Sequence, residues 1–113
     1  RAPRHPQGPT MPDAPESFAE LAWLLVTHPD PGARDPSGAV TLAEHAAALT
    51  NHEHPGMLDV LAATYAATGQ LEQAVATAEV ALSLMPAELN ESSSVIRERL
   101  DSYKRQLSER SPD

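Results

Sequence analysis

Apolar residues recur at steps of three and four along most of the chain, with polar residues between them. This spacing places apolar side chains on one face of an α-helix, whereas a half-buried strand would require strict alternation. Prolines and glycines interrupt the pattern, so the sequence predicts several helices and an all-α fold. The first two expected helices begin at Pro15 and after Asp35, and the others cover about residues 57–68, 71–85 and 88–108.

The breaks between these helices contain residues that stop or start a helix. Residues 28–32 include two prolines and a glycine and end the first helix, and Pro36 suits the first turn of the second. Residues 51–56 break the chain again. Gly69 is expected to adopt the left-handed conformation after the third helix, and Pro86 to end the fourth.

Residues 1–14 carry a proline at every third position. Proline removes a backbone donor and restricts the residue before it, so this segment is predicted to be an extended tail or linker. Two interpretations remain open for it. It is either a solvated linker that follows a preceding domain, or a polyproline II strand that a partner binds.

The third and fourth expected helices carry an ordered set of large and small residues. At successive steps of 3, 1, 3, 9, 4, 3 and 5 the set is Leu58, Leu61, Ala62, Tyr65, Ala74, Ala78, Ala81 and Pro86. It resembles the signature of the tetratricopeptide repeat (TPR) family, with Gly69 at the turn between the helices. It departs from that signature at Ala78, where the family usually has a larger aromatic residue. The first two helices resemble a divergent copy with a turn five residues longer, and its members are Phe18, Leu21, Ala22, Leu25, Ala39, Ala43 and Ala46.

The resemblance implies part of a right-handed α-solenoid in residues 15–109. Two antiparallel helix pairs would occupy residues 15–54 and 55–87, and residues 88–108 would form a capping helix. The apolar stripe of that helix would cover the fourth helix, and a coiled-coil seam with a second copy is the alternative. The stripe consists of Leu89, Ser93, Ile96, Leu100, Tyr103 and Leu107. Residues 21–36 are also similar to TPR units at the ends of longer bacterial proteins, which suggests a terminal part of a longer chain.

In TPR arrays the first helix of each pair lines a concave groove that holds extended peptides. The corresponding residues here are Glu16, Ala19, Trp23, Val26, Thr27, Asp59, Ala63, Ala66 and Ala67. Trp23 lies off the inward stripe of its helix, and exposed tryptophan is typical of binding hot spots. The alternative is that Trp23 packs beneath the turn at residues 28–37 or beneath the proline-rich tail. Some TPR domains clamp the terminal carboxylate of a chaperone, but that clamp requires cations, which neither first helix contains.

Charge and composition narrow the possible partners. The formal net charge is -8, and residues 11–96 contain a single base, Arg34. An acidic body repels phosphate backbones, so nucleic-acid binding is not expected. There is no cysteine, and no apolar run is long enough to cross a bilayer, so membrane insertion is not expected either.

Metal binding and catalysis receive little support from the sequence. His45, His52, Glu53 and His54 are residue types that bind zinc, but three of them fall in a Pro-Gly break where polar residues are common. Ser92, Ser93 and Ser94 have no neighbouring base, and no phosphate-binding loop or nucleophile elbow is present. We therefore predict no cofactor, no metal and no enzymatic activity.

Two functional hypotheses follow. The first is a protein-interaction module that binds a partner protein or an extended peptide in a shallow, apolar and mildly acidic groove with Trp23 as its anchor. The second is a structural or accessory subunit of a larger assembly, possibly membrane-bound, that docks by its tail or its last helix. In either case the partner is another protein or another domain of a longer chain.

Overall fold

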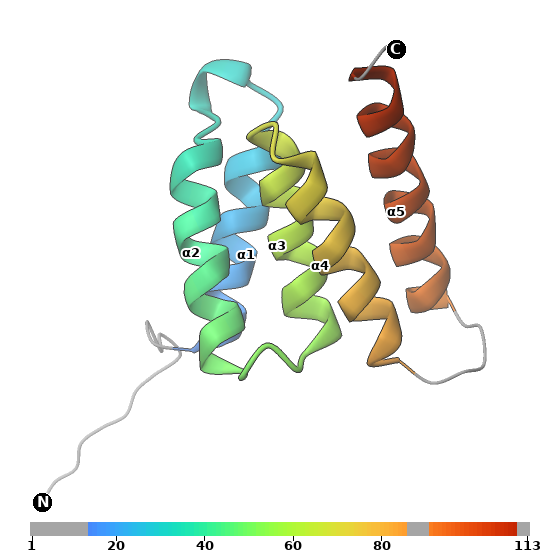
Figure 1. The fold of residues 1–113 in the computed structure, drawn as a ribbon. Helices are drawn as coiled ribbons and strands as arrows, with labels where there is room; N and C mark the ends of the chain where they lie inside the picture. Colours follow the sequence, from blue (N-terminus) through green and yellow to red (C-terminus); the bar gives the residue numbers. More distant parts are fainter. Residues whose placement is uncertain (1–13, 86–90, 111–113) are drawn as a thin grey trace, which may run out of the picture.

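The computed structural model describes residues 14–85 and 91–110, and these ranges are all-α, which confirms the predicted fold class (Figure 1). Its helices are α1 (Pro15–Thr27), α2 (Pro36–Leu49), α3 (Pro55–Ala67), α4 (Leu71–Ser83) and α5 (Glu91–Arg110), with a short 3-10 turn, η1 (Pro31–Ala33), between α1 and α2. The proline-rich residues 1–13 and the predicted start of the last helix at residues 88–90 lie outside the described residues.

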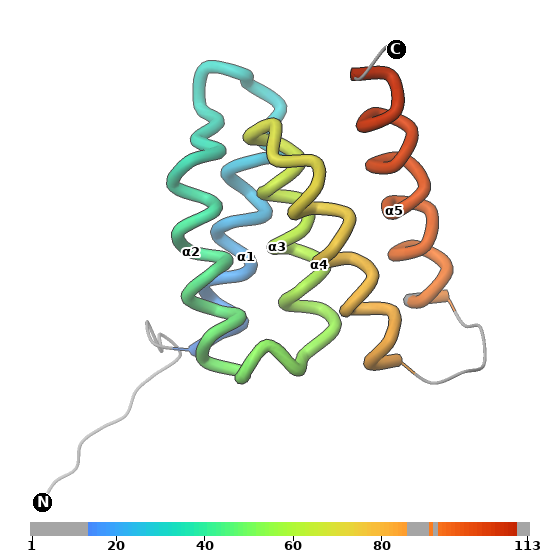
Figure 2. Tube along the Cα trace, viewed as in Figure 1, coloured from blue at the N-terminus to red at the C-terminus, as the bar shows by residue number. Residues whose placement is uncertain are grey.

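The helices are arranged as an array in which helices consecutive in the chain run in opposite directions (Figure 2). Helix α1 packs against α2, and α3 packs against α4. Helix α3 also contacts both helices of the first pair, while α5 packs against α4. As a result α1 and α2 form one edge of the array and α5 forms the other (Figure 2).

Local sequence explains where the helices begin and end. Helices α1, α2 and α3 each have proline in the first turn, where a missing N–H costs nothing. Asp35 caps α2 by accepting a hydrogen bond from the Gly38 N–H. Gly69 has φ of 82° after α3, as predicted. Helix α4 ends at Ser83, two residues before the predicted end, and the N–H of Met85 bonds to the Leu82 carbonyl three residues back, as in a tighter turn.

The core is built mainly from alanine. Ala22 on α1 and Ala39, Ala43 and Ala47 on α2 are completely buried, in one cluster with large residues of α3 and α5. Small side chains at a helix crossing let the backbones approach closely, and the larger side chains fill the remaining space. Those larger residues are Leu58, Leu61 and Ile96.

Helix α5 covers α4 as the sequence predicted. Leu100 and Tyr103 are buried in one cluster with Ala74 and Ala78, so the small residue at Ala78, which departs from the TPR pattern, lies beneath this helix. Exposed ion pairs join Lys104 to Glu79 and Arg110 to Glu72, at 3.6 and 3.9 Å. Of the stripe considered for a coiled coil, Ser93, Ile96, Leu100 and Tyr103 are therefore buried within the chain and Leu107 is half-buried, while Leu89 lies outside the described residues.

Helices α1 and α3 correspond residue for residue at a separation of 40. Pro15 and Pro55 are their first residues, and Thr27 and Ala67 their last. The same separation relates Leu21 to Leu61, Ala22 to Ala62 and Trp23 to Ala63. The two helices therefore provide an internal comparison of equivalent positions in different surroundings.

A candidate binding groove around Trp23 and Arg99

Three open hollows meet on the side of the array formed by α1, α3 and α5. The first has a volume of about 350 Å³, lies between α1 and α3, and extends from Glu16 to Trp23 and Val60. The second, of about 360 Å³, is lined by all three helices and contains both Trp23 and Arg99. The third, of about 480 Å³, lies between α3 and α5 and contains Arg99 and Asp59. Because each shares a residue with the next, we treat the three hollows as one groove.

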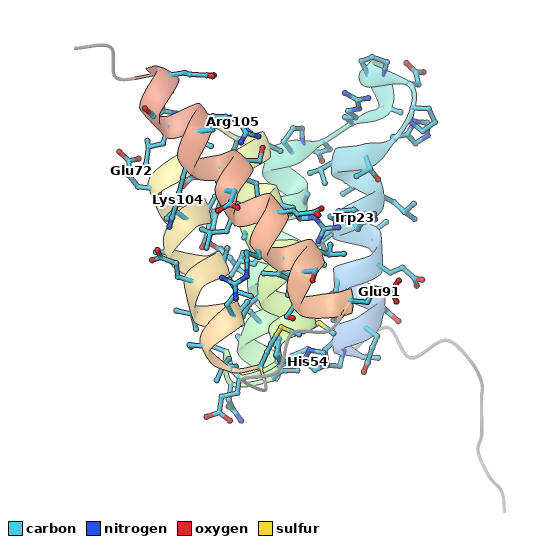
Figure 3. The ribbon with its side chains drawn as sticks, turned by 90° about the vertical axis from the view of Figure 1, so that its right-hand side faces the viewer. Trp23, His54, Glu72, Glu91, Lys104 and Arg105 are labelled. Atoms are coloured by element: carbon cyan, nitrogen blue, oxygen red, sulfur yellow. The ribbon has the colours of Figure 1, made fainter. Side chains whose placement is uncertain are left out.

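The centre of the groove is a stack of three side chains from three helices. The Arg99 guanidinium lies 4.8 Å from the centre of the Trp23 ring, within the range of a cation–π contact. Arg99 also donates a hydrogen bond to Asp59 Oδ2 and forms an ion pair with it. Figure 3 shows Trp23 on α1 beside α5, which lies in front. Arg99 of α5 thus contacts both α1, through Trp23, and α3, through Asp59, in the middle of the groove.

The Asp59–Arg99 pair is partly buried, with 16% of the aspartate side chain and 30% of the arginine side chain exposed. Asp59 Oδ1 is buried, and no hydrogen-bond partner for it is present in the described part of the chain. A carboxylate in such surroundings depends on its one cation, because removal of the cation leaves a buried charge without compensation. Asp59 therefore contributes little net negative charge to the groove, and the exposed carboxylates at its edge are those of Glu16 and Glu20.

All nine residues predicted for the groove line one of these hollows, Glu16 among them. Six of them lie together in the central hollow: Trp23, Val26, Thr27, Ala63, Ala66 and Ala67. Ala19 is only 6% exposed and forms part of the floor between α1 and α3, and Asp59 lies on the α3–α5 side. Trp23 is half-buried, and its ring contacts Arg99, a neighbour that neither interpretation of the sequence had named.

Helix α5 contributes to the groove, which was not predicted from the sequence. Arg99, Tyr103 and Gln106 form part of the wall of the central hollow, although α5 was assigned only to covering α4. Tyr103 belongs to the buried stripe of α5, and Arg99 and Gln106 lie beside that stripe, so the face next to the stripe was the available signal. The sequence could not indicate the direction in which that face points, because this direction depends on how α5 crosses α4.

The tyrosines provide a pH-dependent test of the packing on both sides of α3. Burial and the charge of Asp59 raise the pKa of Tyr103 to about 12, against the lowering effect of Arg99. Burial, and the hydrogen bond from the hydroxyl of Tyr65 to Glu44, raise the pKa of Tyr65 to about 12. Since the fold favours both neutral hydroxyls, the stability they contribute is present below pH 10 and is lost as the pH rises from 10 to about 12.

We therefore expect tyrosinate absorbance of the folded protein to appear near pH 12, and that of the urea-unfolded protein near pH 10. The chain contains two tyrosines, so the signal reports on these two residues alone. Glu44→Gln should lower the pKa of Tyr65 and leave that of Tyr103 unchanged. Titration of both tyrosines near pH 10 in the folded protein would contradict the packing described here.

The histidines considered as metal ligands take part in a helix cap, a ring contact and a turn. His54 caps α3, because its Nδ1 accepts hydrogen bonds from the N–H groups of Gly56 and Met57. His45 makes an edge-to-face contact with Phe18 at 4.7 Å, and His52 occupies the left-handed region with φ of 56°. Within the described residues no three histidine, aspartate or glutamate side chains gather closely enough to hold a metal ion.

Among the described helices, none combines the length and the apolar character that crossing a membrane requires. No family model, curated protein or solved structure matches this chain.

Proposed function

We propose that this chain is a helical-repeat module of the TPR type that binds an extended segment of another protein in the groove between α1, α3 and α5. The observation that carries the proposal is the position of Trp23. It is a half-buried aromatic side chain at the point where two apolar hollows meet. Tryptophan in such a place commonly supplies a large share of the binding energy of an interface.

The dimensions and chemistry of the groove favour a short extended peptide. Helix α1 has 13 residues, so at about 1.5 Å per residue the groove runs for about 20 Å along it. A segment of about six extended residues covers that length at about 3.3 Å per residue. Apolar side chains would contact the Ala63 and Ala67 floor, and a cation of the peptide would lie near Glu16 and Glu20 at the edge.

The test begins with selection of binders from a random library of displayed peptides on the full chain. A recovered peptide is then synthesised and titrated while tryptophan fluorescence is recorded, because Trp23 is the one tryptophan of the sequence. We expect binding to change this fluorescence. Trp23→Ala should weaken the affinity by about 30-fold or more, as measured by calorimetry.

Val80→Ala is the matched control. Val80 is 45% exposed on α4 and lines none of the three hollows, so its truncation should leave the affinity unchanged. Circular dichroism of both variants verifies that the fold is retained. Equal affinity of Trp23→Ala and the parent chain would show that peptides bind elsewhere.

A further inference from the structure

The outer face of α1, which points away from α3, carries exposed leucines at positions that are buried in α3. Leu21 is 47% exposed, whereas its equivalent Leu61 is 3% exposed. Leu24 is 55% exposed, whereas its equivalent Thr64 is completely buried. Since α1 and α3 correspond residue for residue, the difference comes from their surroundings and not from the pattern of the helices.

Leu61 is buried because α2 packs over it. Helix α2 packs against α3, and its residues Ala39, Ala43 and Ala47 share one buried cluster with Leu58 and Leu61. The alanines recur at steps of four, so they form one stripe along α2. Such a stripe lets the α2 backbone approach α3 closely enough for the leucines to be enclosed.

We propose that the outer face of α1 is a docking surface for an α-helix of a partner protein that carries a stripe of small residues, packed on Leu21 and Leu24 as α2 packs on α3. Helix α1 contains two acids, Glu16 and Glu20, and no base, so cations on the flanks of the partner helix complement it. Helix α5 shows the same charge complementarity within the chain. It covers α4, and its Lys104 and Arg110 form ion pairs with glutamates of α4.

Other segments of the chain are poorer candidates for this position. Residues 1–14 directly precede α1, but with a proline at every third position their sequence does not predict a helix. A second copy would need an accessible alanine stripe, and in the described residues the stripes of α2 and α4 are already buried by α3 and α5. A helix from outside residues 1–113 is therefore the occupant that the surface fits, and a small-residue stripe with flanking cations is the chemistry it requires.

The chain itself provides the probe. A second copy of residues 15–54 is inserted between Ala14 and Pro15 of the full chain, so that the copied His54 joins Pro15 as it naturally joins Pro55. This places an α2 sequence before the original α1 in the same register that α2 has before α3. The readout is the loss of unfolding free energy caused by Leu21→Ala in the original α1, measured with urea.

We expect that loss to be at least about three times larger in the duplicated chain than in the parent chain, because the leucine becomes enclosed. An insertion of the same length rich in glycine and serine is the control, and it should leave the effect of Leu21→Ala small. An unchanged effect in the duplicated chain would overturn the proposal. Sedimentation of the parent chain as a dimer that Leu21→Ala dissociates would also overturn it, since a second copy would then be the occupant. Neither result depends on peptide binding in the groove.

Discussion

Leu61→Ala is expected to lower the free energy of unfolding by about 2–5 kcal/mol. Leu61 is 3% exposed and lies in the cluster where α2 meets α3. Truncation leaves a cavity lined largely by alanines, whose methyl groups cannot rotate into it, so the surroundings relax little. Domains of this size are stable by about 5–15 kcal/mol, and the change would therefore remove a large fraction of the total.

Leu21→Ala is the matched control for this prediction. It makes the same chemical change at the equivalent position of α1, but Leu21 is 47% exposed, so the expected cost is below about 1 kcal/mol. Urea unfolding of the two variants and the parent chain measures both values. Similar costs at the two positions would contradict the different surroundings of α1 and α3.

The helices could be predicted from the sequence because the signals that define their ends are local. Proline in the first turn, Asp35 before α2 and Gly69 after α3 act within a few residues. The spacing of apolar residues then indicates which positions of two helices are equivalent, but not whether a neighbouring helix covers them. For the same reason, the equivalence of Leu21 and Leu61 could be read from the sequence, but their different exposure could not.

The electrostatics of the groove could not be predicted in the same way. Asp59 and Arg99 are 40 residues apart, and their contact exists only because α5 crosses beside α3. The groove was expected to be mildly acidic and without cations, since only α1 and α3 were considered. The structure places a guanidinium at its centre, already paired with a carboxylate and stacked on Trp23. The prediction that the groove does not clamp a terminal carboxylate stays a prediction.

The cap formed by His54 illustrates a second limit. The sequence placed this histidine in a break, and imidazole next to glutamate is a combination that also occurs in metal sites. Its actual role depends on one backbone geometry, with Asn51 and His52 in the left-handed region and the ring turned toward the start of α3. Asparagine and histidine adopt positive φ more often than most residues other than glycine, but their presence in a break does not by itself fix that conformation.

Leu100→Ala is the second change with a large expected effect, because it acts on α5, which contributes to both the core and the groove. Leu100 is 5% exposed in the cluster with Ala62, Ala74 and Ala78. We expect a loss of about 2–5 kcal/mol of stability relative to the parent chain. Since the main contact of α5 with the array is along α4, the loss should fall mainly on the docking of α5.

Two probes followed during urea unfolding separate docking of α5 from global unfolding. Loss of α5 takes the Arg99 guanidinium away from Trp23, so tryptophan fluorescence should change at a lower urea concentration than the circular dichroism of the remaining helices. Val95→Ala, at a position 40% exposed on the same helix, should leave the two transitions coincident and close to those of the parent chain. Coincident transitions in Leu100→Ala at a shifted midpoint would mean that α5 unfolds together with the helix pairs. In that case the groove cannot lose its α5 wall while the rest of the array stays folded.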